Sequence, residues 1–291
     1  TGVANALVVD TTAPAAPTVD ALTTNSTTPT ITGTATLGDG ETLAVEVYDS
    51  IGVVDSNFLV AVVRNTWSWT TNFGLSNGTY EVTATITDPA TNEISDTSTE
   101  ELVIDTSEPT VVGVTSTTPD GSYGVGQAVV INIQMSEDVT INTDLGSPTL
   151  ILDAGTANFT SAAGNILTFT YTSQEGDNST GLDVTDLDPN GAVIEDAAEN
   201  EANFTFSGQL AAASNIVIDT EAPTAPGIYV QITNSTPQTI TGTNPTLAAD
   251  EVLSVVVNGA TYEVTPTTTT WSLDLAAAVP TSGTLGAVSY T

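Results

Sequence analysis

The sequence of 291 residues contains no cysteine, no histidine and no lysine, and Arg64 is its single basic residue. Without cysteine and histidine the chain can form no disulfide, no zinc or copper site of ordinary type, and no Ser-His-Asp or Cys-His catalytic group. Without a basic patch it cannot neutralise phosphate groups, so we expect neither nucleic acid nor anionic membrane as a partner. The chain also has no apolar run long enough to span a bilayer. We therefore expect no enzyme and no membrane contact.

Acidic residues are abundant where basic ones are missing. Aspartate and glutamate total 35, and the formal net charge is −34 at pH 7. This excess favours solubility. Because lysine is absent, a cluster of carboxylates can obtain a counter-charge only from a cation in solution.

Short stretches of alternating apolar and polar residues recur along the chain. In 79–88 every second residue from Tyr80 to Ile86 is apolar, which is the period of a half-buried strand. The same period occurs in 129–136, 167–173 and 271–275. Turn sequences such as GDGE, SNGT and DPNG separate such runs, and helical periodicity is nearly absent. The pattern predicts an all-β fold of antiparallel sandwiches.

An apolar run followed by aspartate, a hydroxyl residue and proline occurs three times, as LVVDTTAP (7–14), LVIDTSEP (102–109) and IVIDTEAP (216–223). The intervals between these runs are close to the length of one small domain, so they indicate linkers between repeated modules. The prolines end the preceding strand and stiffen each junction. We predict the end strand of a preceding module in 1–10, modules at 11–105 and 106–219, and a third module at 220–291 that is incomplete at its C-terminus.

The first and third modules are homologous. Asn25 and Asn234 each lie 15 residues after a linker aspartate, and TNSTTPTITGT (24–34) and TNSTPQTITGT (233–243) continue in parallel. Trp67 and Trp271 occupy near-equivalent positions, which favours a role in the core for both. The middle module shares only the linkers and the general plan, so it is a different subtype.

Both module types, with these linkers and with the loops TDPATNE (87–93) and EDAAENE (195–201), resemble the bacterial immunoglobulin-like repeats of very large surface adhesins and biofilm proteins. The resemblance covers the whole chain. It implies tandem immunoglobulin-like antiparallel β-sandwiches arranged as an elongated rod. The chain departs from the family at two loop positions, where Thr91 and Glu199 replace the usual glycine.

The order of strands in such a sandwich brings acidic loops to the pole where the chain enters. In the first module we expect strands B, C, F and G at about 29–36, 42–49, 79–87 and 95–104. The B–C and F–G loops then meet the linker, and oxygen-only ligands in flexible loops suit Ca²⁺. The resembling family also carries calcium at its domain junctions. The alternative is that the acidic loops are simply solvated and keep the fibre soluble.

The candidate calcium ligands fall into three groups. They are Asp10, Asp39, Glu41, Asp88 and Asn92 at the first junction; Asp105, Glu108, Glu137, Asp138, Asp196 and Asn200 at the second; and Asp219, Glu221, Asp250 and Glu251 at the third.

These observations predict a non-enzymatic structural extender or fibre region of a bacterial cell-surface adhesin or extracellular matrix protein, rigidified by calcium at its junctions. Its partners are neighbouring repeats of the same protein, and the adhesion target lies outside this segment. One alternative is a self-assembling pilus-like or surface-layer filament subunit, whose partners are other copies. A second is a carbohydrate-binding module array, in which tryptophans would stack on sugars.

Overall fold

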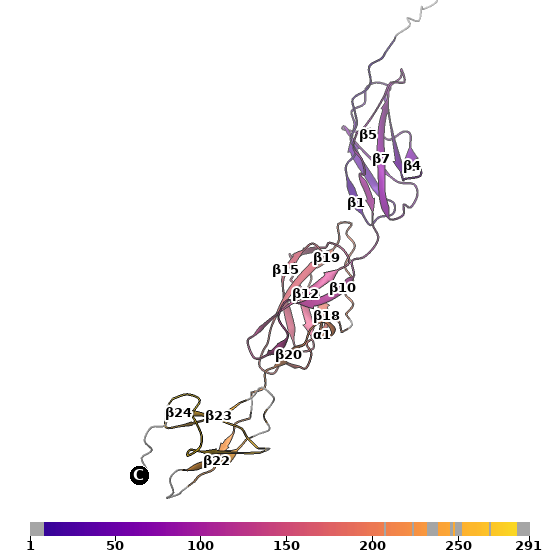
Figure 1. Ribbon diagram of the computed structural model, residues 1–291. Coiled ribbons are helices and arrows are strands. Elements are labelled where there is room, and N and C mark those ends of the chain that lie inside the picture. Colours follow the sequence, from indigo (N-terminus) through magenta and orange to yellow (C-terminus); the bar gives the residue numbers. More distant parts are fainter. Residues whose placement is uncertain are drawn as a thin grey trace, which may run out of the picture. The chain divides into compact units, whose positions relative to one another are not determined.

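The computed structural model describes residues 9–206, 208–222, 224–231, 238–244, 247, 252–267 and 269–283, and the regular secondary structure of these residues is almost entirely β-strand (Figure 1). The chain divides into two compact units, Thr1–Thr220 and Glu221–Thr291. The first unit contains two separate hydrophobic cores, one between Val19 and Ile104 and the other between Val114 and Ile218. Within the described residues no helix has the length and hydrophobicity needed to cross a bilayer.

The first module packs one sheet of order β1-β9-β7-β3-β4, with β8 beside β7, against a sheet of order β2-β6-β5. The strands are β1 Leu22–Thr24, β2 Thr30–Thr34, β3 Thr42–Tyr48, β4 Val53–Asn57, β5 Val62–Val63, β6 Thr66–Thr70, β7 Gly78–Thr87, β8 Glu93–Ser95 and β9 Leu102–Ile104. Strand β7 buries every second side chain from Tyr80 to Ile86. The period of two predicted for this stretch is therefore confirmed.

The second module has a main sheet of order β10-β12-β16-β15-β14-β18 and smaller sheets β11-β20-β17 and β13-β19. The strands are β10 Val111–Ser116, β11 Gly121–Tyr123, β12 Ala128–Met135, β13 Thr140–Asn142, β14 Thr149–Leu152, β15 Thr156–Ala163, β16 Ile166–Thr172, β17 Asn178–Ser179, β18 Val184–Asp188, β19 Val193–Glu195 and β20 Ile216–Asp219, and one short helix, α1, spans Gln209–Ala213. The predicted strands over 129–136 and 167–173 correspond to β12 and β16, which pair antiparallel.

The third module contributes two small sheets, β21-β22-β25 and β23-β24. The strands are β21 Gly227–Ile228, β22 Thr239–Thr243, β23 Leu253–Val257, β24 Ala260–Val264 and β25 Thr270–Asp274. Most of the predicted end strand in 1–10, and the predicted incomplete C-terminus of this module from 284 onward, lie outside the described residues. The module boundaries near 105 and 219 stay a prediction.

The first and third modules share one detail of packing that explains their common sequence. Gly33 pairs with Trp67 across β2 and β6, and the Trp67 Nε1 group donates to the carbonyl oxygen of Thr18 at 3.1 Å. A Cβ atom at Gly33 would clash with the same oxygen, so only glycine fits.

The equivalent pair in the third module is Gly242 and Trp271, and Trp271 Nε1 donates to the carbonyl oxygen of Gly227 at 3.1 Å. Trp67, Trp69 and Trp271 are all buried. The expected core role of the tryptophans is confirmed, and they form no exposed platform for sugars.

Candidate metal centre

The loop from Asp88 to Asn92, between β7 and β8, is organised by one carboxylate. Asp88 Oδ1 accepts hydrogen bonds from the backbone N–H groups of Ala90 at 2.8 Å and Asn92 at 2.9 Å, and Asn92 Nδ2 donates to Asp88 Oδ2 at 2.8 Å. These bonds, above all that from the Asn92 side chain, hold the pKa of Asp88 below its usual range. Asp88 is therefore a fixed anion at neutral pH.

The loop from Asp196 to Asn200, which follows β19, repeats this arrangement in the second module. Asp196 Oδ1 accepts from the backbone N–H groups of Ala198 at 2.7 Å and Asn200 at 2.9 Å, and Asn200 Nδ2 donates to Asp196 Oδ2 at 2.8 Å. Asp196 and Asn200 are both buried. Two modules with different sheet orders thus use one Asp-x-Ala-x-Asn loop, which we call the acidic loop.

Both acidic loops contain a non-glycine residue in the left-handed region. Thr91 has φ 69° and Glu199 has φ 68°, at the two positions where glycine was expected from the family pattern. The loops therefore close tightly without glycine. This conformation costs a residue with a Cβ atom about 1–2 kcal/mol, which the hydrogen bonds to the aspartate offset.

The acidic loops also hold the linkers, through the main chain of the linker aspartates. Asn92 Nδ2 donates to the carbonyl oxygen of Asp10 at 3.2 Å, and Asn200 Nδ2 donates to that of Asp105 at 2.9 Å. We call each such pair a linker clamp. It explains the asparagine of the loop, and it shows that linker and loop meet as the strand order predicts.

The linker aspartate carboxylates have a local role of their own. Asp10 Oδ1 accepts from the backbone N–H of Thr12 at 3.0 Å, and Asp105 Oδ1 accepts from that of Ser107 at 2.9 Å. Each aspartate therefore closes a turn two residues ahead, just before the proline. The repeated aspartate stiffens the linker whether or not it binds a metal.

The second junction brings three carboxylates together. One oxygen from each of Asp105, Glu137 and Asp196 lies within 4.8 Å of the other two, and Asp196 is buried while the others are half-buried. Burial, together with the charges of Asp105 and Asp196, raises the pKa of Glu137. The chain's single basic residue, Arg64, is an exposed side chain of the first module. Three oxygen donors without an internal cation fit the ligand preference of calcium.

The other predicted ligands of the second junction lie outside this group. Glu108 Oε1 accepts from Asn203 Nδ2 at 2.9 Å. Asp138 is exposed and lies near the β15–β16 turn, where a Cβ atom at Gly164 would be 3.2 Å from its carboxylate. Asn200 contacts Asp196 and Asp105 through its amide nitrogen.

The first junction does not gather its predicted carboxylates in the same way. Glu41 Oε2 accepts from the backbone N–H of Gly38 at 2.7 Å, so this side chain closes its own turn, and Asp39 is exposed. The two loops do meet, because a Cβ atom at Gly40 would lie 2.8 Å from the ring of Pro89. Across the described part of the chain, the second junction is the one place with three carboxylates at ligand distance.

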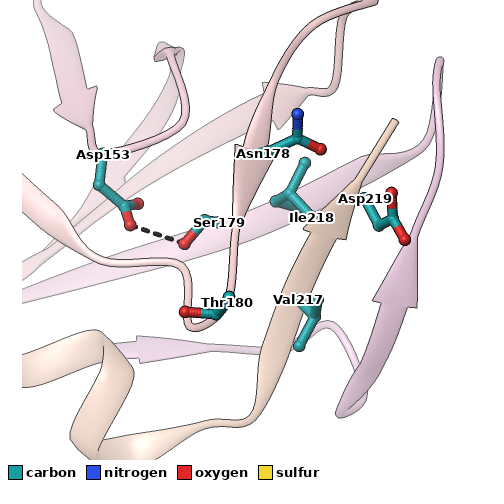
Figure 2. Close-up of a pocket in the computed structure, with 7 residues that line it drawn as sticks. All are labelled: Asp153, Asn178, Ser179, Thr180, Val217, Ile218 and Asp219. Atoms are coloured by element: carbon teal, nitrogen blue, oxygen red, sulfur yellow. Dashed lines mark hydrogen bonds between the residues drawn. The ribbon is translucent and has the colours of Figure 1, made fainter. Parts of the chain in front are cut away.

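At the third junction, Asp219 and Glu221 are exposed, whereas Asp250 and Glu251 lie outside the described residues. Asp219 lines a cavity of about 490 Å³ at the end of the second module, together with Asp153 and Ser179 (Figure 2). The Ser179 hydroxyl donates to Asp153 at 2.6 Å, and the Asp219 carboxylate points away from this pair. The carboxylates of Asp153 and Asp219 therefore point in different directions in this cavity (Figure 2).

Sequence reasoning missed two asparagines of the second junction. Asn77 Oδ1 accepts from the backbone N–H of Thr106 at 3.1 Å and from its hydroxyl at 2.8 Å, so it holds the linker from the side of the first module. Asn25 donates to the acidic loop of the second module. The shared offset of Asn25 and Asn234 from their linker aspartates was the available signal.

Comparison with known proteins agrees with the strand order and the linkers. Residues 8–106 match a family model described as a bacterial Ig-like domain. The first module therefore matches the bacterial Ig-like family. The matched residues run from the end of the first predicted linker strand to the start of the second linker, so the resemblance noted in the linkers and loops is confirmed there. Comparison with curated proteins finds no match.

Solved structures that match the chain include titin fragments and a T cell receptor. A mutated variant of three titin domains is 11% identical, with 89% of each chain covered and a TM-score of 0.37. A titin I-band fragment has the same identity and coverage and a TM-score of 0.35, and a marsupial T cell receptor is 12% identical, with 88% of this chain and 89% of the receptor chain covered and a TM-score of 0.22. At these values the similarity carries no argument about function.

Proposed function

We propose that the chain is a structural extender region of a bacterial cell-surface adhesin or extracellular matrix protein, a rod of immunoglobulin-like modules outside the cell. The observation that carries this proposal is the recurrence of the linker clamp. Asn92 holds Asp10 and Asn200 holds Asp105, although the sheets of the two modules differ in strand order. A linker fixed to the next module transmits orientation along the chain, whereas a free linker does not.

The residue content supports a mechanical role over a catalytic one. Bacterial Ig-like modules are typically structural, and this chain has no histidine, cysteine or lysine to form a nucleophile with its base. Its partners are then neighbouring modules of the same protein, and the adhesion target binds elsewhere.

Calcium is the second part of the proposal. Asp105, Glu137 and Asp196 would hold the ion with their carboxylate oxygens, and the ion would supply the positive charge that the chain lacks. Without that charge, the three carboxylates repel one another beside a linker held by hydrogen bonds. These three carboxylates therefore favour a junction whose two modules move less relative to each other when calcium is bound.

The decisive experiment measures the chain in calcium and in EDTA at fixed ionic strength, by small-angle scattering and by calorimetric titration. We expect calcium to bind and to narrow the distribution of interatomic distances. Glu137→Gln should abolish binding without disturbing the acidic loop, because Asp196 and Asn200 organise that loop by themselves. The matched control is Glu175→Gln, in an exposed turn of the same module. Identical scattering and no heat of binding in the unaltered chain would refute the calcium part.

A further inference from the structure

The acidic loop uses its backbone in an asymmetric way. In the loop of the second module, the backbone N–H groups of Ala198 and Asn200 donate hydrogen bonds to the Asp196 carboxylate. The carbonyl oxygens of Ala198 and Glu199 accept hydrogen bonds from outside the loop. A loop of this kind is an acceptor surface, and the partner that fits it must offer donors with the same spacing.

The first module supplies those donors from one residue. The backbone N–H of Asn25 donates to the carbonyl oxygen of Ala198 at 3.0 Å, and Asn25 Nδ2 donates to that of Glu199 at 2.9 Å. One asparagine therefore contacts two consecutive carbonyl groups of the next module, 173 and 174 residues further along the sequence. Two donors at fixed positions define both place and orientation.

The turn that carries Asn25 is fixed by its own module. Ser26 N–H donates to Thr24 Oγ1 at 3.1 Å, and the backbone N–H of Leu75 donates to the carbonyl oxygen of Thr27 at 2.7 Å. Strand β1, which leads into the turn, pairs in parallel with β9, the strand that leads into the linker. The donors and the linker are thus built on neighbouring strands, so the entropy lost on docking is small.

We propose that the 24–27 turn is a docking element that positions one module on the next by donating to the carbonyl groups of its acidic loop, without a metal ion. The partner is an immunoglobulin-like module with an Asp-x-Ala-x-Asn loop. The equivalent carbonyl groups of the first module belong to Ala90 and Thr91, both exposed residues, and they form the matching acceptor surface for a preceding module. The proposal rests on the extender function but not on calcium.

Asn25→Asp provides the test, because it keeps the size of the side chain and replaces the amide donor with a carboxylate that faces a carbonyl oxygen. In EDTA, hydrogen exchange at the 24–27 turn should become about tenfold faster, and scattering should show a broader distribution of distances between the first two modules. The melting temperatures of the modules should stay within a degree or so, since their cores are untouched. The control is Asn158→Asp, on an exposed position of β15.

Asn25→Ala separates loss of the donor from added charge, and it should show the same exchange effect with a smaller change in scattering. Unchanged exchange and unchanged scattering in both Asn25 variants would overturn the docking element. Calcium titration of Asn25→Asp distinguishes the docking proposal from the calcium proposal. Binding that persists with a loosened turn supports docking independent of the metal, whereas an Asn25 effect seen only with calcium present would contradict it.

Discussion

Asp88 and Asp196 organise acidic loops of the same geometry, but their surroundings differ. Around Asp196, two further carboxylates, Asp105 and Glu137, lie at ligand distance. Around Asp88, the acid of the neighbouring loop, Glu41, is bonded to its own backbone instead. Holding the linker and gathering metal ligands are therefore separate roles of the acidic loop. The linker clamp occurs at both junctions, whereas among the described residues a group of three carboxylates occurs only at the second.

The difference has a simple physical origin in the loops opposite. In the first module, the glycines on either side of Asp39 allow a tight turn that Glu41 closes onto Gly38. In the second module, Glu137 lies in the bend that follows β12, and its carboxylate lies within 4.8 Å of those of Asp105 and Asp196. Glu41 Oε2 is thus bonded to Gly38 within its own turn, whereas the Glu137 carboxylate lies beside those of Asp105 and Asp196.

The largest effect should come from removing the organising carboxylate. Asp196→Ala should lower the free energy of unfolding of the second module by about 2–4 kcal/mol, because two backbone N–H groups and one amide lose a charged, buried acceptor. Urea denaturation followed by hydrogen exchange in β12 and β16 measures this. Asp144→Ala, at an exposed position, should stay within about 0.5 kcal/mol. A similar change for both variants would show that the loop is not organised by Asp196.

Calcium should distinguish the two junctions. With the affinity usual for extracellular modules, about 0.1–1 mM, roughly 10 mM calcium should stabilise the second module by about 1.4–2.7 kcal/mol. The first module should change little, since Glu41 and Asp39 are not gathered around Asp88. Hydrogen exchange in β3 and β7 for the first module and in β12 and β16 for the second provides the readout. Equal stabilisation of both modules would mean that the observed difference has no consequence for binding.

Lowering the pH should destabilise the first module through protonation of Asp88. Because its pKa is lowered in the folded state, the contribution of Asp88 to stability is present above the unfolded value and is lost as the pH falls through the folded one. Asn92→Ala removes the main cause of that shift, so the variant should be less stable at pH 7 and should lose less on going to about pH 2.5. Urea denaturation followed by hydrogen exchange in β3 and β7 tests this. Parallel pH curves for the two proteins would contradict the assignment.

The smallest effect concerns the left-handed residues. Thr91→Gly and Glu199→Gly should each raise the free energy of unfolding by about 0.5–1 kcal/mol, since glycine adopts this conformation without the cost that a Cβ atom imposes but loses more entropy on folding. The gain should be larger for Thr91, which is β-branched. A loss of stability at either position would indicate that the side chain makes a contact worth more than the backbone cost.

The sequence by itself determined the all-β fold class and the positions of the linkers between modules. Alternation in 79–88 and 129–136 predicted β7 and β12 because a half-buried strand must place apolar residues at every second position. The linker motif predicted where strands end, because proline cannot continue a ladder. The homology of 24–34 with 233–243 predicted equivalent tryptophans, and the contact of Gly33 with the Thr18 carbonyl supplies the reason for the glycine in that motif.

Tertiary structure decided which acids act together. Asp138 and Glu137 are adjacent in sequence, yet only Glu137 joins Asp105 and Asp196, because the Asp138 carboxylate lies beside Gly164 in the β15–β16 turn. Asn25 shows the same limit more strongly. Its backbone and side-chain donors meet carbonyl groups more than 170 residues away, and the repeated position of Asn25 and Asn234 marks the residue without identifying those acceptors.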